Sequence, residues 1–373
     1  MSERKHIVFV TEHLTFGGAE VVLTTYLKTI DPKLYQVSLI IRDDLGEKNY
    51  LLKEVPSHIN VYTLFNEADG KLRCNKAELR KRFRASFAKL GNVDVVVDFS
   101  PVLDKIIHRL KIKKSILWMH GDKSHMGFCE RLKYRLRIRN YDKIVLLCDE
   151  MREQFSGLFP ELKNKFVVIA NPFVIEDVKA KSLNEAELSE LDREMMKKKF
   201  IVSVARLVPG KDFQTVIEAA RILKCKGYSY RHYIIGDGEL RGELQGLIDK
   251  YSLNDMVFLL GAKKNPYPWI FNSEFFVHSA NREGFGLVIV EAMILRKAVI
   301  ATKCPVGPDD ILNHGEFGKL FGLNDATGLA NHIASYLKDT DLRGHFERKA
   351  EKRAQYYSVD NILPLLYSAF DSE

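Results

Sequence analysis

The sequence predicts an α/β protein built from two doubly wound, Rossmann-like domains that face a central cleft. Its 373 residues exceed what one ordinary hydrophobic core holds, so two domains with a cleft between them are expected. Short apolar segments alternate with helix-like segments, which is typical of a parallel sheet covered by helices on both faces. This alternation stops between Ile175 and Lys199 and then starts again.

We place the first domain at residues 1–178. It opens with an apolar strand at His6–Thr11, a turn at Phe16-Gly17-Gly18, a helix at Ala19–Ile30 and a strand at Gln36–Ile41, which is a βαβ unit. Further strands are predicted at 59–65, 93–99, 115–120, 143–148 and 166–170.

We place the second domain at residues 179–357. The polar segment 175–199 is interpreted as a linker with a surface helix. Beyond it, strands are predicted at 200–205, 232–236, 257–260, 274–279 and 298–302, and helices at 213–226, 240–251, 268–272 and 287–295. From Phe321 onward the pattern is helical to the end of the chain.

Composition limits the classes of function. Hydrophobic residues make up 46% and charged residues 28%, and no apolar run is long enough to span a bilayer, which argues against an integral membrane protein. The N-terminus reads as a first strand rather than a signal peptide, so the predicted location is the cytoplasm. A formal net charge of +8 favours an anionic partner: nucleic acid, a phosphorylated substrate or an anionic membrane surface.

The stretch from Phe275 to Leu295 holds two acids around a glycine hinge. Glu283 precedes Gly284-Phe285-Gly286, and the apolar helix from Leu287 contains Glu291. A carboxylate in such a helix is expected to be shielded from water and therefore to need a partner. The two glycines let backbone N–H groups at the helix start face a ligand.

Two cations and a glycine turn follow strands of the same domain. Arg206 and Lys211 come after the strand at 200–205, at the sheet edge where α/β proteins bind ligands, and together they suit a diphosphate. Gly236-Asp237-Gly238 follows the next strand and opens a helix, which favours an anion or a hydroxyl.

Taken in order, Arg206 and Lys211, the Gly-Asp-Gly turn, Leu260-Gly261, and Glu283 with Glu291 eight positions later resemble the donor half of the retaining glycosyltransferases of family 4. These enzymes have the GT-B fold. The resemblance covers nearly the whole chain and is most specific between residues 204 and 312. Two departures are Asn171-Pro172 after the strand at 166–170, and Asp310 where glutamate is usual.

The resemblance implies a role for each donor residue. Glu291 would hold the ribose hydroxyls of a nucleotide-diphosphate sugar, and Glu283 would contact the transferred sugar. The backbone from Gly284 through Phe285 and Gly286 to Leu287 would lie against the sugar and phosphates, with Gly236 and Gly238 nearby. Arg206 and Lys211 would neutralise the leaving diphosphate.

In the first domain, the resemblance places a phosphate and acceptor loop at Gly17 and Gly18, and places His120 beside the donor sugar. Residues 1–178 would then bind the acceptor and residues 179–357 the donor. A C-terminal helix at about 358–373 would pack back on the first domain.

The implied activity is that of a retaining hexosyl- or N-acetylhexosaminyltransferase. The donor would be a UDP- or GDP-sugar, with UDP preferred. The acceptor would be a glycan, plausibly linked to a polyprenyl diphosphate or another lipid, in polysaccharide, lipopolysaccharide or glycoprotein glycan biosynthesis. No protein nucleophile is apparent, and front-face substitution is implied. Asp339-Thr340-Asp341 is interpreted as a helix cap, so no metal site and no cofactor are expected.

Two basic segments, 70–90 and 131–139, could bind an anionic membrane or a lipid-linked diphosphate, which would place the protein at the inner face of the cytoplasmic membrane. In 70–90, Leu72, Leu79, Phe83 and Phe87 form an apolar stripe among basic residues. The alternative is a solvated helix packed on its own sheet.

Each of these residues also has an ordinary interpretation. Glu283 and Glu291 could be surface or salt-bridged carboxylates. Arg206 and Lys211 could be ordinary surface charges, and His120 could be a structural histidine. Two alternative functions stay open: a sugar-nucleotide epimerase or hydrolase of the same fold, and a non-catalytic anion- or membrane-binding protein. Nucleic-acid binding is disfavoured because the basic clusters lack interleaved aromatic residues and a groove-reading motif.

Overall fold

The computed structural model describes residues 4–15, 17–66, 68–69, 75–123 and 126–372, and the chain separates into two compact units. Unit 1 comprises Met1–Phe173 together with Val359–Glu373, and unit 2 comprises Val174–Ser358. The first boundary therefore precedes the predicted one at residue 178. Segment 175–199 holds two helices, α5 (Ile175–Ser182) and α6 (Glu190–Met196). Helix α5 packs on helices of unit 2, so it belongs to that unit's structure.

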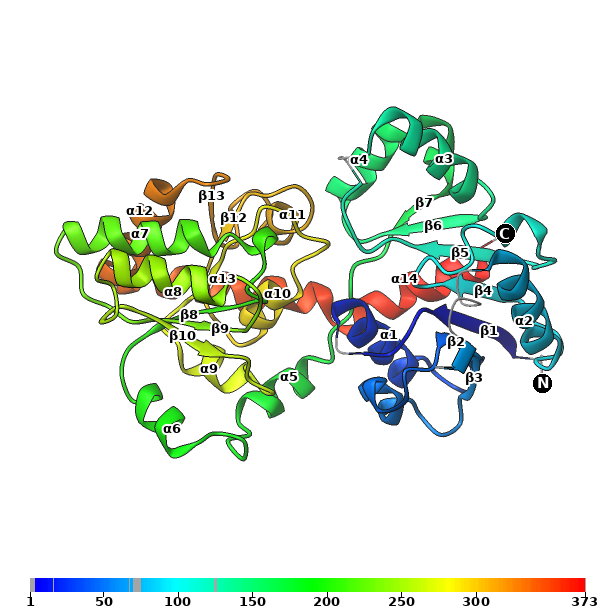
Figure 1. Ribbon diagram of the computed structural model, residues 1–373, viewed down its shortest axis with the longest axis horizontal. Helices are drawn as coiled ribbons and strands as arrows, with labels where there is room; N and C mark the ends of the chain where they lie inside the picture. The colour runs from blue at the N-terminus through cyan, green and yellow to red at the C-terminus, as the bar shows by residue number, and fades with distance from the viewer. Residues whose placement is uncertain (1–3, 16, 67, 70–74, 124–125, 373) are drawn as a thin grey trace. The chain divides into compact units, whose positions relative to one another are not determined.

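Unit 1 contains one parallel sheet of seven strands in the order β3-β2-β1-β4-β5-β6-β7 (Figure 1). The order reverses between β1 and β4, as in doubly wound folds, because successive strands are added first on one side of β1 and then on the other. The strands are β1 (Lys5–Thr11), β2 (Tyr35–Asp43), β3 (Asn60–Phe65), β4 (Val95–Asp98), β5 (Ser115–Trp118), β6 (Lys143–Leu146) and β7 (Phe166–Val168).

Helices cover both faces of this sheet. Helix α1 (Gly18–Thr29) packs Tyr26 against Phe99 and Trp118, with ring centroids 6.3 and 5.3 Å apart. The next residue, Met119, accepts a hydrogen bond of 3.2 Å from Tyr134 on helix α3 (Phe128–Ile138). Because successive strand residues point to opposite faces, α1 and α3 lie on different sides of the sheet.

The C-terminal helix α14 (Val359–Asp371) is part of unit 1. Phe370 packs edge-on against Phe9 of the central strand and against Tyr35, with ring centroids 6.3 and 5.5 Å apart. The ammonium group of Lys114 donates to the carbonyl oxygen of Phe370 at 3.2 Å, which places a cation at the negative end of the helix. The chain thus returns to the first sheet after completing unit 2.

Helix α2 (Lys76–Ala88) forms most of the described part of the basic segment 70–90, whose binding to a membrane stays a prediction. Leu79 and Phe83 are buried, and Phe83 stacks on Phe87 with ring centroids 5.4 Å apart, so the apolar stripe faces the core of unit 1. Residues 70–74, with Leu72, lie outside the described residues. The alternative of a helix packed on its own sheet therefore holds for the described part of 70–90.

Unit 2 contains a parallel sheet of six strands in the order β10-β9-β8-β11-β12-β13, which reverses between β8 and β11. The strands are β8 (Ile201–Val204), β9 (His232–Ile235), β10 (Val257–Gly261), β11 (Phe276–His278), β12 (Val299–Thr302) and β13 (Lys319–Phe321). The last strand was not predicted, because three residues between two glycines carry too short a pattern.

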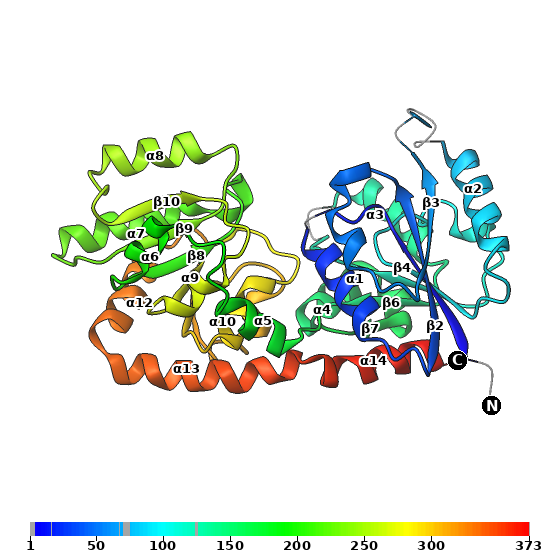
Figure 2. The same ribbon diagram turned by 90° about the horizontal axis from the view of Figure 1, so that it is seen from below.

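Two helix layers enclose the sheet of unit 2 (Figure 2). One hydrophobic core cluster joins α7 (Phe213–Cys225), α8 (Arg241–Lys250) and α12 (Ala326–Lys338) to the buried sides of the strands. Helices α5, α9 (Tyr267–Asn272), α10 (Leu287–Ile294) and α13 (Thr340–Ala354) pack on one another in a second group.

The remaining helices are short. They are α4 (Asp149–Leu158), α11 (Pro308–Ile311) and the 3-10 helices at Gly46–Lys48, Tyr50–Glu54, Ile107–Arg109, Pro160–Lys165, Pro209–Lys211 and Gln355–Tyr357. Within the described ranges, every helix is too short or too polar to cross a lipid bilayer.

The attachment of α14 can be tested by truncating Phe370, which is 2% exposed. We expect Phe370→Ala to lower the free energy of unfolding of unit 1 by about 3 to 5 kcal/mol, because it leaves a cavity against Phe9 and Tyr35. Urea unfolding followed by the fluorescence of Trp118, in a Trp269→Phe background, measures unit 1 alone.

The matched control for this test is Leu365→Ala on the same helix, since Leu365 is 42% exposed. It should change the free energy of unfolding by less than about 0.5 kcal/mol. Equal effects of the two substitutions would show that the packing of Phe370 does not hold α14 to the sheet.

Candidate functional site

Parallel α/β sheets bind ligands outside the carboxyl ends of their strands, at the point where the strand order reverses. In unit 2 this point lies between β8 and β11, and in unit 1 between β1 and β4. Clusters of polar side chains occupy both positions. They define a candidate site in each unit.

In unit 2, the loops that follow β8 and β11 are tied together by hydrogen bonds. The amide of Asn281 donates to the carbonyl oxygen of Gly210 at 3.0 Å, and the hydroxyl of Ser279 donates to the carbonyl oxygen of Lys211 at 3.0 Å. Asp212, which follows Lys211, adopts a left-handed conformation and caps α7 through the amide of Thr215. The position of Lys211 is therefore fixed by both loops.

Glu283 lies at the centre of this cluster. Its Oε1 atom accepts a hydrogen bond of 2.9 Å from Nε2 of His278 and forms an ion pair with the ammonium group of Lys211. The Lys211, Glu283 and His278 side chains are 20%, 11% and 2% exposed, so the cluster is largely shielded from water. Two of these residues, Lys211 and Glu283, were predicted from the sequence.

Glu283 stays ionised despite its burial. Burial by itself would raise its pKa, but the hydrogen bond from His278 and the charges of His278 and Lys211 outweigh this effect and lower the pKa to about 2. Nδ1 of His278 is buried and makes no hydrogen bond with the described residues. The cluster therefore presents a fixed carboxylate beside a cation.

Arg206 lies two residues beyond the end of β8. Its side chain is exposed and forms no salt bridge with the residues that the structure describes. An exposed guanidinium group at the carboxyl end of a central strand is available to an anionic ligand. Lys211 and Arg206 thus differ, since only Lys211 is engaged in an ion pair.

Close packing of the backbone requires glycine at both ends of the Gly236-Asp237-Gly238 turn. A Cβ atom on Gly236 would lie 1.8 Å from the carbonyl oxygen of Ala205, and one on Gly238 would lie 2.4 Å from that of Leu207. The loop after β9 therefore crosses directly over the loop after β8. These glycines set the position of Arg206, a role that the sequence did not reveal.

Helix α10 begins at Leu287, directly after the glycine hinge. Gly286 has φ = 98°, a left-handed conformation that favours glycine, and no side chain caps the helix. The first amide groups of a helix lack partners within the helix, so they can donate to an anion or a hydroxyl. Phe285 is 4% exposed and packs on Tyr357, so Gly284, Phe285 and Gly286 can meet a ligand only through their backbone.

Glu291 has a partner that the sequence did not predict. The hydroxyl of Tyr267 on α9 donates to Oε1 of Glu291 at 3.0 Å. Burial raises the pKa of Glu291, and the hydrogen bond from Tyr267 opposes that shift. No hydrogen bond or ion pair between the described residues links Glu291 directly to Glu283, so the two predicted acids belong to separate clusters.

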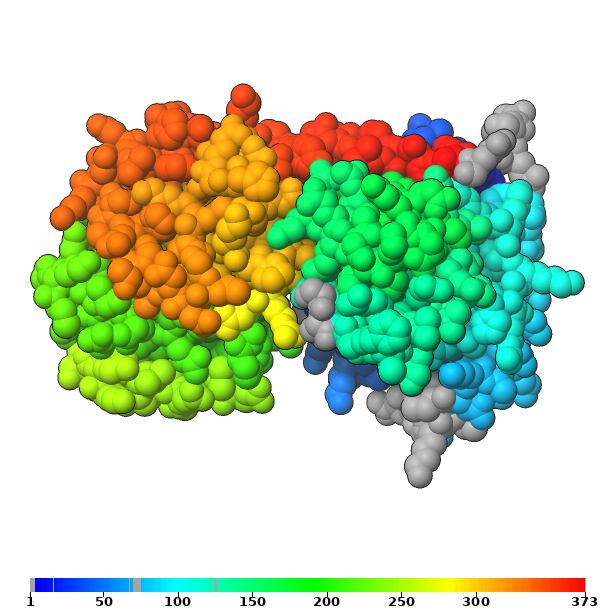
Figure 3. Space-filling view, turned by 90° about the horizontal axis from the view of Figure 1, so that it is seen from above, coloured from blue at the N-terminus to red at the C-terminus, as the bar shows by residue number. Residues whose placement is uncertain are grey.

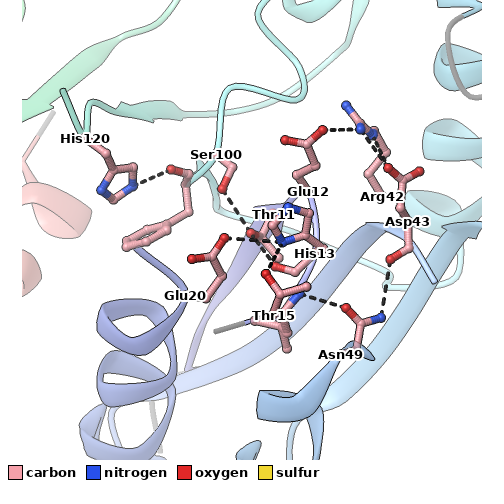
Figure 4. Close-up of polar contacts among 12 residues, drawn as sticks. Thr11, Glu12, His13, Thr15, Glu20, Arg42, Asp43, Asn49, Ser100 and His120 are labelled. Carbon is pink, nitrogen blue, oxygen red and sulfur yellow. Dashed lines mark hydrogen bonds and ion pairs between the residues drawn. The ribbon is translucent and has the colours of Figure 1, made fainter. Parts of the chain in front are cut away.

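In unit 1, polar residues follow the ends of β1 and β4 (Figure 4). The hydroxyl groups of Thr11 and Ser100 lie 3.1 Å apart across the reversal point. Next along the chain, Nδ1 of His13 lies 3.3 Å from a carboxylate oxygen of Glu20 on α1 and 3.2 Å from the hydroxyl of Thr15. The imidazole is therefore held beside a carboxylate.

A second group joins the ends of β1 and β2 (Figure 4). The guanidinium group of Arg42 pairs with Glu12 and donates to Asp43 at 2.7 Å. Asn49 accepts from the amide of Leu14 at 2.9 Å, which holds the loop after β1. Glu12 is 44% exposed, so this carboxylate remains accessible to a ligand.

Gly17 and Gly18 begin α1. Gly17 is the residue before the helix, and a Cβ atom there would lie 2.2 Å from Oε2 of Glu20. The absence of a side chain at Gly17 thus leaves room for the carboxylate that faces His13. The two predicted glycines thus lie at the start of α1, beside the contact between His13 and Glu20 that was not predicted.

His120 follows β5 and donates from Nε2 to the carbonyl oxygen of Phe99 at 2.7 Å. A carbonyl oxygen can only accept, so Nε2 carries the proton. Burial lowers the pKa of His120 to about 4, although the hydrogen bond to Phe99 opposes the shift. His120 is therefore neutral near pH 7, and its Nδ1 atom is a hydrogen-bond acceptor.

Sequence reasoning missed four residues in unit 1, Glu12, His13, Glu20 and Arg42, and two in unit 2, Tyr267 and His278. The rule applied to Arg206 and Lys211, that polar residues after a strand lie at the ligand edge, would also have selected Glu12 and His13. Tyr267 gives no such signal, because it comes from a helix distant in the chain.

Asp339 caps α13, as predicted, since its side chain accepts from the amide of Leu342 at 2.8 Å. In the part of the chain that the structure describes, no three histidine, cysteine or acidic side chains lie together as a metal site would require.

Comparison with known proteins agrees with this fold. Residues 186–353 match the family described as glycosyl transferases group 1. The chain is 26% identical over 365 residues to an N-acetylgalactosamine-N,N'-diacetylbacillosaminyl-diphospho-undecaprenol 4-alpha-N-acetylgalactosaminyltransferase of Campylobacter jejuni, covering 93% of this chain and 94% of that protein. It is 26% identical over 224 residues to a poly(ribitol-phosphate) alpha-N-acetylglucosaminyltransferase of Staphylococcus aureus, covering 60% and 45% of the two chains.

Among solved structures, Anabaena HepE in complex with UDP and glucose superimposes with a TM-score of 0.78 at 22% identity, covering 98% of this chain and 99% of that chain. This likeness shows the GT-B fold. The match to residues 186–353 and the two relatives show that the chain is an enzyme, a glycosyltransferase.

The pKa of Glu283 predicts how stability depends on pH. Its pKa is lowered from 4.5 to about 2, so the carboxylate stabilises the fold fully above about pH 4.5 and loses that effect as the pH falls toward 2. Relative to Glu283→Gln, the wild-type protein should lose about 3 kcal/mol of unfolding free energy between about pH 5 and about pH 2. Urea unfolding of both proteins at several pH values measures the difference. The same pH dependence in both proteins would contradict the ionised state of Glu283.

Proposed function

We propose that this glycosyltransferase moves a sugar from a UDP-sugar to a glycan acceptor with retention of the anomeric configuration. The observation that carries the proposal is the cluster of Lys211, Glu283 and His278 at the point where the sheet of unit 2 reverses. A buried carboxylate beside a cation suits a sugar whose leaving group is a diphosphate. HepE, which has the same fold, was solved in complex with UDP and glucose, and this supports the choice of donor.

In the donor half, each charged group has a part. Lys211 has three N–H donors, so its ammonium group can keep its ion pair with Glu283 and also bind a phosphate oxygen. Arg206, which is exposed and unpaired among the described residues, adds a second cation for the diphosphate. The first amide groups of α10 donate to the phosphates or the sugar. Glu291, with Tyr267 on its Oε1 atom, binds the ribose hydroxyls.

The chemical step follows from the state of Glu283. A carboxylate with a pKa of about 2 is a weak base and a weak nucleophile, and its Oε1 atom is already engaged by two donors. In the proposed step, the acceptor oxygen bonds to the anomeric carbon on the face from which the diphosphate leaves. The bond from that carbon to the diphosphate oxygen breaks, and the acceptor proton passes to this oxygen. Lys211 and Arg206 stabilise the charge that develops there.

Unit 1 supplies the groups that hold the acceptor. His13 beside Glu20, and Glu12 beside Arg42, offer donors and acceptors suited to sugar hydroxyls. Neutral His120 can accept a hydrogen bond from a sugar hydroxyl through Nδ1. The Campylobacter relative is named for an acceptor on diphospho-undecaprenol, which supports a polyprenyl-diphosphate-linked glycan as the acceptor of this enzyme.

A screen of nucleotide sugars tests the donor half. We expect UDP-sugars to raise the melting temperature, because a ligand that binds only the folded state stabilises it. Lys211→Ala should weaken this effect and lower transfer by about 100-fold or more, since it removes the cation that meets the leaving diphosphate. The matched control, Lys352→Ala, removes an exposed lysine of unit 2 and should change neither. If no nucleoside diphosphate stabilises the wild-type protein, the donor site is misassigned.

The product separates this function from its alternatives. Mass spectrometry of the reaction should detect an acceptor lengthened by one sugar, whereas an epimerase or hydrolase would alter the free sugar or the nucleotide sugar only. Transfer should persist in the presence of EDTA, because the proposed step uses Lys211 and Arg206 in place of a divalent cation. Loss of transfer that Mg²⁺ restores would contradict this part of the proposal.

His13 tests the acceptor half. His13→Gln keeps a hydrogen-bonding side chain but cannot reproduce the contact between the imidazole ring and Glu20, so we expect the KM for the acceptor to rise by about tenfold. The affinity for UDP, measured by calorimetry, should stay unchanged. His58→Gln, at an exposed position of unit 1, is the control. A matching loss of UDP affinity in His13→Gln would assign this loop to the donor instead.

A further inference from the structure

Helix α3 of unit 1 leaves a row of large apolar side chains in solvent. Phe128, Leu132 and Leu136 are 79%, 45% and 48% exposed. They recur at every fourth position, so they lie along one side of the helix. Figure 3 shows the segment of α3 and α4, in green, on the surface of unit 1.

The opposite side of α3 packs against the rest of unit 1. Ile138 is fully buried, and Tyr134 contacts Met119 and packs on Phe159 with ring centroids 6.1 Å apart. These contacts hold α3 against unit 1 without any help from the exposed row. The packing of this unit therefore leaves most of Phe128 and about half of Leu132 and Leu136 in solvent.

Basic residues lie on both sides of the row. By helical periodicity, Arg135 and Arg139 are on one side and Lys133 is on the other. Lys133 and Arg139 are exposed and form no ion pair with the described residues. Arg135 lies 3.2 Å from Glu161, and both side chains are about half exposed. Glu130, the one acid within α3, lies nearly opposite Leu132 on the helix.

The second basic helix does not share this arrangement. In α2, Leu79 and Phe83 are 8% and 1% exposed. Arg82 bonds to Asp69 at 2.8 Å and lies over the ring of Phe65, 4.7 Å from its centroid. This helix presents charge to the solvent but keeps its apolar side in the core. The two segments, which are both rich in basic residues, thus differ in what they expose.

We propose that α3 docks unit 1 on an anionic lipid bilayer. The helix lies in the plane of the surface, Phe128, Leu132 and Leu136 enter the boundary with the acyl chains, and Lys133 and Arg139 meet the anionic headgroups. An apolar row between cations is complementary to this boundary, where apolar tails lie beneath negative charge. The inference deepens the proposed function, on which it rests for the lipid-linked acceptor, because docking brings the enzyme to the surface that holds this substrate.

A fluorescent reporter tests insertion directly. The two native tryptophans, Trp118 and Trp269, are fully buried, so an indole introduced by Phe128→Trp is the one exposed to solvent. Its emission should shift to the blue when vesicles of phosphatidylcholine with phosphatidylglycerol are added, and should not shift with phosphatidylcholine alone. No shift with the anionic vesicles would overturn the proposal.

Sedimentation with the same vesicles measures the contribution of the row. Leu132→Gln with Leu136→Gln should weaken binding by about tenfold or more, because two inserted apolar side chains are lost. The matched control is Leu183→Gln with Leu191→Gln, whose leucines are 69% and 68% exposed in unit 2, and it should bind as the wild type does. Raising the salt from about 0.1 M to about 1 M should weaken the binding of all three proteins, since it shortens the Debye length from about 10 Å to about 3 Å.

Other results would overturn the proposal. Equal sedimentation of the α3 variant and the wild type would show that the row is not inserted. A wild-type dimer in solution that the α3 variant converts to a monomer would assign the row to a second copy of the chain.

Transfer to a water-soluble acceptor separates this inference from the proposed function. The α3 variant should keep that transfer while losing vesicle binding. If the wild-type protein binds vesicles through α3 but transfers no sugar, the proposed function fails and the membrane contact stands.

Discussion

The ion pair of Lys211 with Glu283 is the contact on which the candidate donor site depends. It joins the loop after β8 to the loop after β11, the two strands at which the sheet of unit 2 reverses. A carboxylate buried to this degree would ordinarily be neutral, yet His278 and Lys211 keep Glu283 charged. The hydrogen bonds from Asn281 to Gly210 and from Ser279 to Lys211 hold the same two loops. The ion pair and the hydrogen bonds thus hold the same two loops together.

The sequence predicted most of the fold because its strands are short, apolar and separated by helices of clear periodicity. The strands at His6–Thr11 and Gln36–Ile41 occur within one or two residues of their predicted ends. Strand β13 could not be predicted, since three residues give no periodicity and its place in the sheet is decided by pairing with β12. The same limit applies to α5, which is polar enough to resemble a linker but packs Ile175 and Val178 into unit 2.

The candidate site was predicted in part. Lys211 and Glu283 were both predicted as site residues. Their direct contact was not predicted, because it depends on which strands are neighbours in the sheet. Tyr267 beside Glu291, and Glu20 beside His13, are pairs between different elements, and composition does not reveal them. The same holds for helices α2 and α3. The sequence indicates a basic helix in both places, but the packing of unit 1 decides which of the two has its apolar side covered.

The chain enters unit 2 at Val174 and returns to unit 1 at Val359, so unit 2 is continuous in sequence whereas unit 1 is assembled from two segments. During synthesis, all residues of unit 2 are added before those of α14. Unit 1, in contrast, cannot be completed until the end of the chain is made, because Phe9 and Tyr35 stay uncovered until Phe370 arrives. Unit 1 is therefore begun first and completed last. A premature stop before α14 would leave an apolar face of its central strands open to aggregation.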